Sequence, residues 1–141
     1  MDFGELLKVF LLDLQSIFRY RVSSPDLTLP QILLLSSISS EGTDMSSLSK
    51  QLGVDNSTLT RLVDVLIKRD WTEKTKDRYD RRITILRLTN KGQVIQEQIE
   101  ERIDFFGDTV YASIAIEDRD EVKEILSSFH WTLSKMLLRQ E

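Results

Sequence analysis

Residues 77–92 read DRYDRRITILRLTNKG, a stretch in which a charged cluster gives way to a strand-forming segment. Three arginines fall within the charged part. Residues 83–88 are rich in β-branched side chains and, like residues 71–75 upstream, contain no Gly or Pro. Both features favour strands. We therefore predict two antiparallel strands joined by a projecting turn that carries the arginines.

Two short helices are predicted just before this hairpin. Ser46 or Ser47 can cap the first helix, and Gly53 allows it to stop in left-handed backbone. Asp55 or Asn56 can cap the second helix, which should end near Arg69. A helix, a glycine-containing turn and a second helix are the layout of a helix-turn-helix.

The chain before these helices also has helical patterns. Apolar residues recur at helical spacing over residues 3–18, which predicts a helix with a wide apolar face. Residues 23–25 (SSP) break the pattern. Thr28 and Gln31 have the spacing of a capping box, so we expect a further helix to start there and to end before Glu41.

Two longer helices are predicted after the hairpin. Thr89 is expected to cap a helix that continues through Val110. A last helix should begin near Glu117, whose acidic side chain suits the positive end of a helix dipole, and its apolar stripe extends to Leu137. Together these segments predict a mostly α fold with one small β-hairpin.

Composition limits the class of protein. The chain has 141 residues, enough for one domain with its own core. It has no cysteine, which excludes disulfides and thiol-based redox sensing within this chain. No apolar run has membrane-spanning length, and the N-terminus has an early acid and no basic segment. We therefore expect a cytoplasmic protein with no membrane partner.

Signals of enzymatic chemistry are weak. The sequence has one histidine, His130, and neither a Gly-rich phosphate loop nor a His/Glu pair with metal-ligand spacing. A single histidine on a helix is more often structural than catalytic. We therefore expect no enzyme activity, no metal site and no cofactor.

Charge is distributed unevenly along a chain whose net charge is −4. Residues 61–91 contain ten Lys or Arg and five Asp or Glu, giving +5, and the rest of the chain carries −9. A basic region on an acidic body fits a polyanionic partner. Simple solvation of a charged surface explains the cluster equally well, so charge alone does not decide between the two.

Residues 28–92 resemble the MarR family (multiple-antibiotic-resistance regulators) of prokaryotic winged helix-turn-helix transcription factors. Leu27-Thr28 with Pro30-Gln31 is similar to the entry of the family's second helix. The sharpest match, Asp80-Arg81-Arg82 with Leu88-Thr89 and Gly92, is similar to the D-x-R…LT-x-x-G signature of the wing. The order of the elements extends the resemblance over nearly the whole chain. The positions typical of the helix-turn-helix are Leu48, Ser49, Leu52, Gly53, Val54, Leu59 and Leu62.

Two departures from the family pattern lie near the wing. Asp70 stands where the family often has Gly between the recognition helix and the wing, although Asp tolerates left-handed backbone better than most residues. Lys74 and Lys76 stand where the first wing strand often carries Arg. The resemblance therefore predicts the architecture, while individual phosphate contacts are expected to differ.

The resemblance implies one MarR-like domain over residues 1–141. Residues 28–92 would form the winged helix-turn-helix DNA-binding lobe, and residues 1–22 and 93–141 a helical dimerisation region. It implies a sequence-specific transcriptional regulator that binds a pseudo-palindromic operator in double-stranded DNA as a homodimer. The expected mode is repression that a small aromatic or anionic effector relieves, and the sequence identifies neither that effector nor its binding residues.

Candidates for reading bases lie on the predicted recognition helix, because a helix in the major groove contacts base edges with its N-terminal residues. Asp64, on the same face, could accept from a cytosine amino group or pair with Arg61 or Lys68. The alternative is an ordinary solvent-exposed face. The candidates are Asn56, Ser57, Thr58, Thr60, Arg61 and Lys68.

Candidates for phosphate and minor-groove contact lie on the hairpin, because a thin basic arm can enter that narrow groove. The resemblance implies that Arg82 is the groove arginine or a close neighbour of it, and Asp80 is expected to orient Arg82 through a salt bridge. The alternative is a solvated hairpin. The wing candidates are Lys74, Lys76, Arg78, Arg81 and Arg82.

The first and last helices have apolar faces wider than a lone helix needs, which favours packing against a second copy over a purely intramolecular core. Two other functions stay open: a winged helix that binds an acidic protein partner, and a small-molecule-binding protein or enzyme without direct DNA binding. The residues expected at the dimer interface are Phe3, Leu7, Phe10, Leu14, Phe129, Leu133, Met136 and Leu137.

Overall fold

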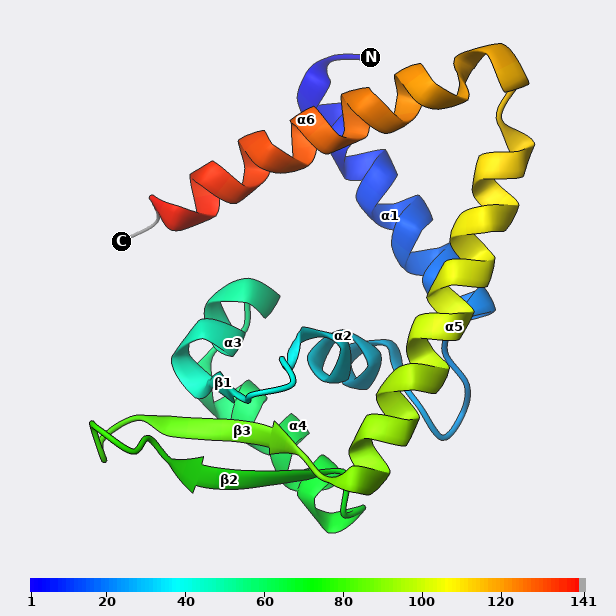
Figure 1. Ribbon diagram of the computed structural model, residues 1–141. Coiled ribbons are helices and arrows are strands. Elements are labelled where there is room, and N and C mark those ends of the chain that lie inside the picture. Colours follow the sequence, from blue (N-terminus) through cyan, green and yellow to red (C-terminus); the bar gives the residue numbers. More distant parts are fainter. Residues whose placement is uncertain (140–141) are drawn as a thin grey trace. The chain divides into compact units, whose positions relative to one another are not determined.

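The computed structural model describes residues 1–139 (Figure 1). The chain divides into two compact units, Met1–Ile103 and Asp104–Glu141. The first unit contains the helix-turn-helix, a small sheet and the N-terminal helix, and the second contains the last helix. The predicted mostly α fold with a small β-wing is confirmed.

The N-terminal helix and the helix that follows begin at the caps that their sequences favour. Helix α1 spans Phe3–Arg21, and the Asp2 carboxylate accepts the backbone N–H of Glu5 at 2.9 Å. Helix α2 spans Leu29–Ser37. The capping box predicted for α2 is present, because Thr28 Oγ1 accepts the Gln31 N–H and Gln31 Oε1 accepts the Thr28 N–H.

Helix α3, Met45–Leu52, begins at Asp44 rather than at a serine, so the predicted serine cap was wrong. The Asp44 carboxylate accepts both the backbone N–H of Ser47 (2.9 Å) and its hydroxyl (2.7 Å). A carboxylate is a stronger acceptor than a hydroxyl, and pairing with Ile85 in the sheet fixes the position of Asp44. The helix ends as predicted at Gly53, whose φ of 66° lies in the left-handed region.

The sheet has three antiparallel strands in the order β1-β3-β2. The hairpin strands β2, Thr72–Lys76, and β3, Thr84–Leu88, lie within one residue of the predicted segments. Strand β1, Thr43–Asp44, was not predicted, because two residues carry no periodic signal and are ordered only by pairing with β3. The hairpin projects from the helices of the first unit (Figure 1).

Helix α4, Asn56–Lys68, packs its apolar face into the core of the first unit. After this helix the chain turns through Asp70, whose φ of 63° confirms that an aspartate holds the left-handed position at the entry to the wing. Residues from α2, α3, α4, β3 and α5 are fully buried together, so one core sets the position of both the helix-turn-helix and the wing. Its largest members are Ile32, Leu34, Leu35, Leu48, Leu59, Leu66, Leu86 and Ile99.

Helix α5, Asn90–Ser113, starts against the base of the wing. The Thr89 hydroxyl accepts the Gly92 N–H at 3.0 Å and donates to the Asp70 carbonyl at 2.6 Å. A Cβ at Gly92 would lie 1.9 Å from the Trp71 carbonyl oxygen, so only glycine fits at this junction. The wing base and the start of α5 therefore form one closely packed joint.

Further along, α5 is held to the ends of α1 and α2 by two side chains. Gln96 Nε2 donates to the carbonyls of Leu35 (2.7 Å) and Ile38 (2.9 Å), and Arg102 Nη1 donates to the Val22 carbonyl at 3.1 Å. These bonds use carbonyls near the C-terminal ends of the two helices, where few backbone N–H groups follow to serve as partners.

The second unit holds the end of α5, a short 3₁₀ turn η1 (Ile116–Asp118) and helix α6 (Arg119–Leu138). Arg119 donates to the carbonyls of Ile114 (2.9 Å) and Ala112 (3.0 Å), which caps the end of α5. Neither α1 nor α6 has a fully buried residue among those described. None of the described helices combines the length and apolarity needed to cross a membrane.

Candidate nucleic-acid interface

The start of α4 is fixed by Asp55. Its carboxylate accepts the Thr58 N–H at 2.7 Å and the Ser57 hydroxyl at 3.0 Å. The Thr58 N–H, followed by the two side-chain hydroxyls and the Arg61 charge, holds the pKa of Asp55 below its ordinary value. The carboxylate therefore stays ionised at neutral pH and keeps the first turn of the helix in place.

The candidate recognition residues point away from the core, except that Thr58 is half-buried. Asn56, Ser57, Thr60 and Arg61 are exposed near the start of α4, and Lys68 is exposed at its end. The Thr60 hydroxyl donates to the Asn56 carbonyl at 2.8 Å, and the Arg61 guanidinium reaches the Thr58 hydroxyl at 3.5 Å.

Asp64, farther along the same face, lies 3.9 Å from Lys74 Nζ on β2. The ion pair recorded for Asp64 therefore links the recognition helix to the wing instead of joining it to Arg61 or Lys68. Both side chains are well exposed, so this pair contributes little to folding stability. Its effect is to place one lysine of the wing beside the outer face of α4.

The turn at the wing tip is built by two aspartates. Asp77 Oδ2 accepts the backbone N–H groups of Tyr79 (3.0 Å) and Asp80 (2.9 Å), which is an Asx-type turn. The backbone closes the tip through Asp77 N–H to the Ile83 carbonyl and Ile83 N–H to the Asp80 carbonyl. Sequence reasoning missed Asp77, although an Asp preceding a short polar turn is a recognisable signal.

Asp80 and Arg82 form a two-pronged ion pair. Arg82 Nε and Nη2 each donate to one carboxylate oxygen of Asp80 at 3.1 Å, and the Arg82 backbone N–H donates to Oδ1. The Arg82 guanidinium, then its backbone N–H, lowers the pKa of Asp80, and the carboxylate raises the pKa of Arg82. The Arg82 side chain is nevertheless 90% exposed, so it is held in one direction while open to a ligand.

The other basic residues divide into exposed and structural groups. Arg78 and Arg81 are exposed at the tip. Arg69 instead donates to the Asp26 carbonyl and stacks over Trp71, and Arg87 donates to the Glu41 carbonyl. Counting charge along the sequence therefore overstates the cations available to a partner, because the folded chain uses two of them internally.

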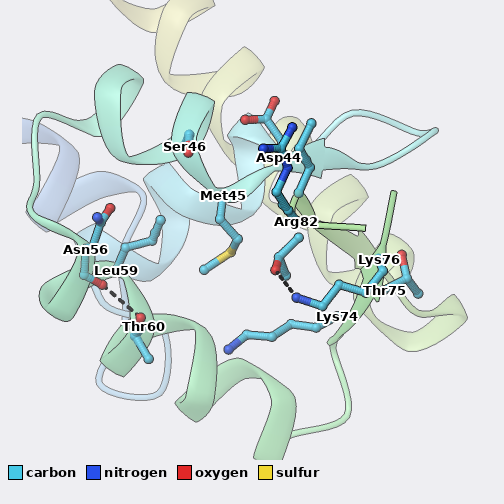
Figure 2. Close-up of a pocket in the computed structure, with 12 residues that line it drawn as sticks. Asp44, Met45, Ser46, Asn56, Leu59, Thr60, Lys74, Thr75, Lys76 and Arg82 are labelled. Atoms are coloured by element: carbon cyan, nitrogen blue, oxygen red, sulfur yellow. Dashed lines mark hydrogen bonds between the residues drawn. The ribbon is translucent and has the colours of Figure 1, made fainter. Parts of the chain in front are cut away.

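A groove of about 700 Å³ lies between the wing and the starts of α3 and α4. Figure 2 shows Lys74 and Lys76 on one side, Asn56 and Thr60 on the other, and the Met45 side chain between them. Arg82 also lines the groove, and Lys76 Nζ donates to Thr84 Oγ1 at 3.0 Å. The groove thus brings together five predicted site residues from two separate elements.

Some of the residues predicted from the sequence do not line this groove. The start of α3 does line it, although it was not predicted to belong to the site. Arg61, Lys68, Arg78 and Arg81 do not line the groove. Asp44, Met45 and Ser46 line it at the start of α3, and no sequence pattern had singled them out as site residues. The predicted dimerisation residues lie on α1 and α6, in different units of the chain.

Comparison with known proteins adds to this geometry. Residues 27–84 match the model of the MarR family. Over 74 residues the chain is 34% identical to an uncharacterized HTH-type transcriptional regulator, YhbI, of Bacillus subtilis, covering 52% of this chain and 48% of that protein. Over 82 residues it is 35% identical to the multiple antibiotic resistance protein MarR of Salmonella typhimurium, covering 57% of each. The matched segments thus span about half the length of these relatives.

Solved structures agree on the fold over a longer stretch. FabT of Streptococcus pneumoniae, in complex with DNA, has a TM-score of 0.74 at 20% identity and covers 94% of this chain and 96% of its own. CouR bound to a 23-mer DNA duplex has a TM-score of 0.75 at 23% identity, covering 92% of each chain. PcaV of Streptomyces coelicolor with its natural ligand has a TM-score of 0.71 at 24% identity, again covering 92% of each.

These findings agree with the wing motif and with the helix-turn-helix geometry. The two relatives matched in sequence are named as a transcriptional regulator and a resistance protein, and neither name is that of an enzyme. Residues 27–84 therefore match the MarR family, and the fold is that of a winged helix-turn-helix.

Proposed function

We propose that this chain is a sequence-specific regulator of transcription that binds double-stranded DNA as a homodimer. The observation that carries the proposal is the groove in which the start of α4 faces the cations of the wing. Asn56 and Thr60 offer hydrogen-bonding groups on one side, and Lys74, Lys76 and Arg82 offer positive charge on the other. Base edges and phosphates require this combination.

The two elements fit the two grooves of the duplex. The residues at the N-terminus of helix α4 are exposed to solvent. A helix that reads base edges in the major groove contacts them with such N-terminal residues. The wing is a two-stranded hairpin with Arg78, Arg81 and Arg82 exposed near its tip. Arginine in a thin arm is favoured in the electronegative minor groove beside a major-groove contact.

A homodimer is supported by apolar surface that the folded chain leaves exposed. On α1, Phe3 is 63% exposed and Phe10 53%, and on α6, Met136 is 60% exposed and Leu137 51%. Exposed apolar surface of this extent marks an interaction site, and a two-fold dimer is the commonest way to cover it. We infer that residues 1–22 and 93–141 form the dimerisation region and residues 28–92 the DNA-binding lobe.

Regulation would follow from the same geometry. A dimer bound across a promoter blocks transcription, which makes repression the proposed mode. A small aromatic or anionic effector could relieve repression only if it bound better to a dimer whose recognition helices are misplaced for DNA. The similarity in fold to PcaV, whose structure holds its natural ligand, supports an effector but not its identity.

Selection from a random-sequence duplex library tests the proposal. A two-fold dimer should enrich an inverted repeat whose half-sites are centred about 10 base pairs apart or a multiple of that spacing. Recovery of no preferred sequence, with weak and uniform binding to all duplexes, would contradict sequence-specific regulation. Capture of an acidic protein without any DNA binding would support the protein-interaction alternative instead.

A further inference from the structure

Tyr79 occupies the tip of the wing without serving the fold. Its side chain is 90% exposed, so the ring contributes almost nothing to the core. The turn that presents it is held by backbone N–H groups donating to Asp77, which need no tyrosine ring. Exposing an aromatic ring to water is unfavourable, so a partner that covers the ring would gain from its burial.

The neighbours of this ring indicate what the partner is. The Arg78 guanidinium lies 5.8 Å from the ring centroid, and Arg81 and Arg82 are exposed on the other side of Tyr79 in sequence. An aromatic ring among three arginines suits a surface on which anionic groups alternate with apolar ones. The backbone of DNA is such a surface, because deoxyribose rings separate its phosphates and tyrosine hydroxyls are among the groups that contact phosphate.

We propose that Tyr79 is a further DNA-contacting residue of the wing. Its ring packs on a deoxyribose at the wall of the minor groove, and its hydroxyl donates a hydrogen bond to an adjacent phosphate oxygen. The contact rests on the proposed DNA-binding function and deepens it. Because tyrosine is neutral, it adds affinity without displacing a condensed counterion, whereas each arginine that neutralises a phosphate does displace one.

The test is a salt titration of binding to the duplex enriched by selection, with Tyr79→Ala, Tyr79→Phe and the control Tyr20→Ala. Tyr20 is 91% exposed but lies on α1, away from the wing. We expect Tyr79→Ala to weaken binding about tenfold at every salt concentration with an unchanged log–log slope. Tyr79→Phe should weaken it about threefold, since it loses only the hydroxyl. Tyr20→Ala should bind as the wild type does.

Several outcomes would overturn the inference. Wild-type affinity in Tyr79→Ala would show that the ring makes no contact, and the proposed function would stand. A salt slope reduced by about one would show that the ring acts only by placing Arg78, so a direct contact would be wrong. Equal affinity of Tyr79→Phe and wild type would remove the hydroxyl bond. Failure of the wild type to bind any duplex would overturn the proposed function and, with it, this inference.

Discussion

The recognition helix and the wing border the same groove, yet they are built from different chemistry. At the start of α4 most exposed side chains are neutral, and their hydroxyls already donate within the helix, as Thr60 does to Asn56. The exposed side chains of the wing are mainly cations, with Arg82 held in place by Asp80. The hydroxyl and amide groups of α4 can match the donors and acceptors of base edges, whereas the cations of the wing fit the charge of phosphate.

This difference assigns separate tasks to the two regions within the proposed function. The wing should supply affinity that depends on salt and little on sequence. Helix α4 should supply discrimination between sequences, because base edges offer the donors and acceptors that its side chains can match. Substitutions in the two regions should therefore change different properties of DNA binding.

The largest effect is expected from breaking the joint that positions both regions. Gly92→Ala places a Cβ against the Trp71 carbonyl, so the base of the wing and the start of α5 must move apart. We expect a loss of about 3 kcal/mol in the free energy of unfolding, measured by urea denaturation. Gly107→Ala is the matched control, because its Cβ meets no atom within 4 Å and alanine favours helix. Equal stability of the two variants would contradict the close packing.

The second-largest effect is expected in the wing. Arg82→Ala removes an exposed guanidinium that its pair with Asp80 holds in one direction. We expect binding to the selected and the scrambled duplex to weaken alike, by about 30-fold or about 2 kcal/mol, with a salt slope smaller by about one. Arg69→Lys is a control that keeps the charge at a cation used inside the fold. Unchanged affinity of Arg82→Ala would remove the wing from the proposed mechanism.

An effect of similar size but greater selectivity is expected from the recognition helix. Arg61→Ala should weaken binding to the selected duplex by roughly 1–3 kcal/mol, since Arg can contact guanine through two hydrogen bonds. Binding to scrambled DNA should change much less. Competition between the two duplexes measures the ratio directly. Equal losses on both would show that Arg61 contacts phosphate rather than a base.

The smallest effect concerns pH. The pKa of Asp80 is lowered in the folded chain, so its pair with Arg82 orders the wing above the ordinary pKa of the carboxyl and is lost as pH falls through the folded value. We therefore expect no change in the Arg82 Nε–H NMR signal between about pH 5 and pH 7, and loss of its hydrogen-bonded shift only in stronger acid. Asp80→Asn should show the acid-like shift at neutral pH. A transition near neutral pH would contradict this pairing.

Local signals in the sequence predicted much of the fold. The capping box at Thr28 and Gln31, the left-handed stop at Gly53 and the turn at Asp70 all depend on neighbouring residues. What the sequence did not reveal depends on partners in other helices or strands. Strand β1 forms by pairing with β3, and Asp64 forms an ion pair with a lysine on β2 rather than with a residue of its own helix.

The candidate site shows the same limit. Its cations could be named from the sequence, but pattern alone could not show that Arg69 and Arg87 are used inside the fold. Nor could it show that the start of α3 lines the groove beside α4 and the wing. Both facts follow from tertiary packing. The two arginines, for example, donate to carbonyls that lie 43 and 46 residues away in the sequence.

A salt titration of wild-type binding to the selected duplex and to its scrambled counterpart tests the proposed function most directly. We expect two steep, nearly parallel log–log lines, because the cations of the wing contact phosphate in both complexes. We expect the selected duplex to bind more tightly throughout, since α4 adds contacts to the bases. Coincident lines would contradict sequence reading by α4, and a flat dependence on salt would contradict phosphate binding by the wing.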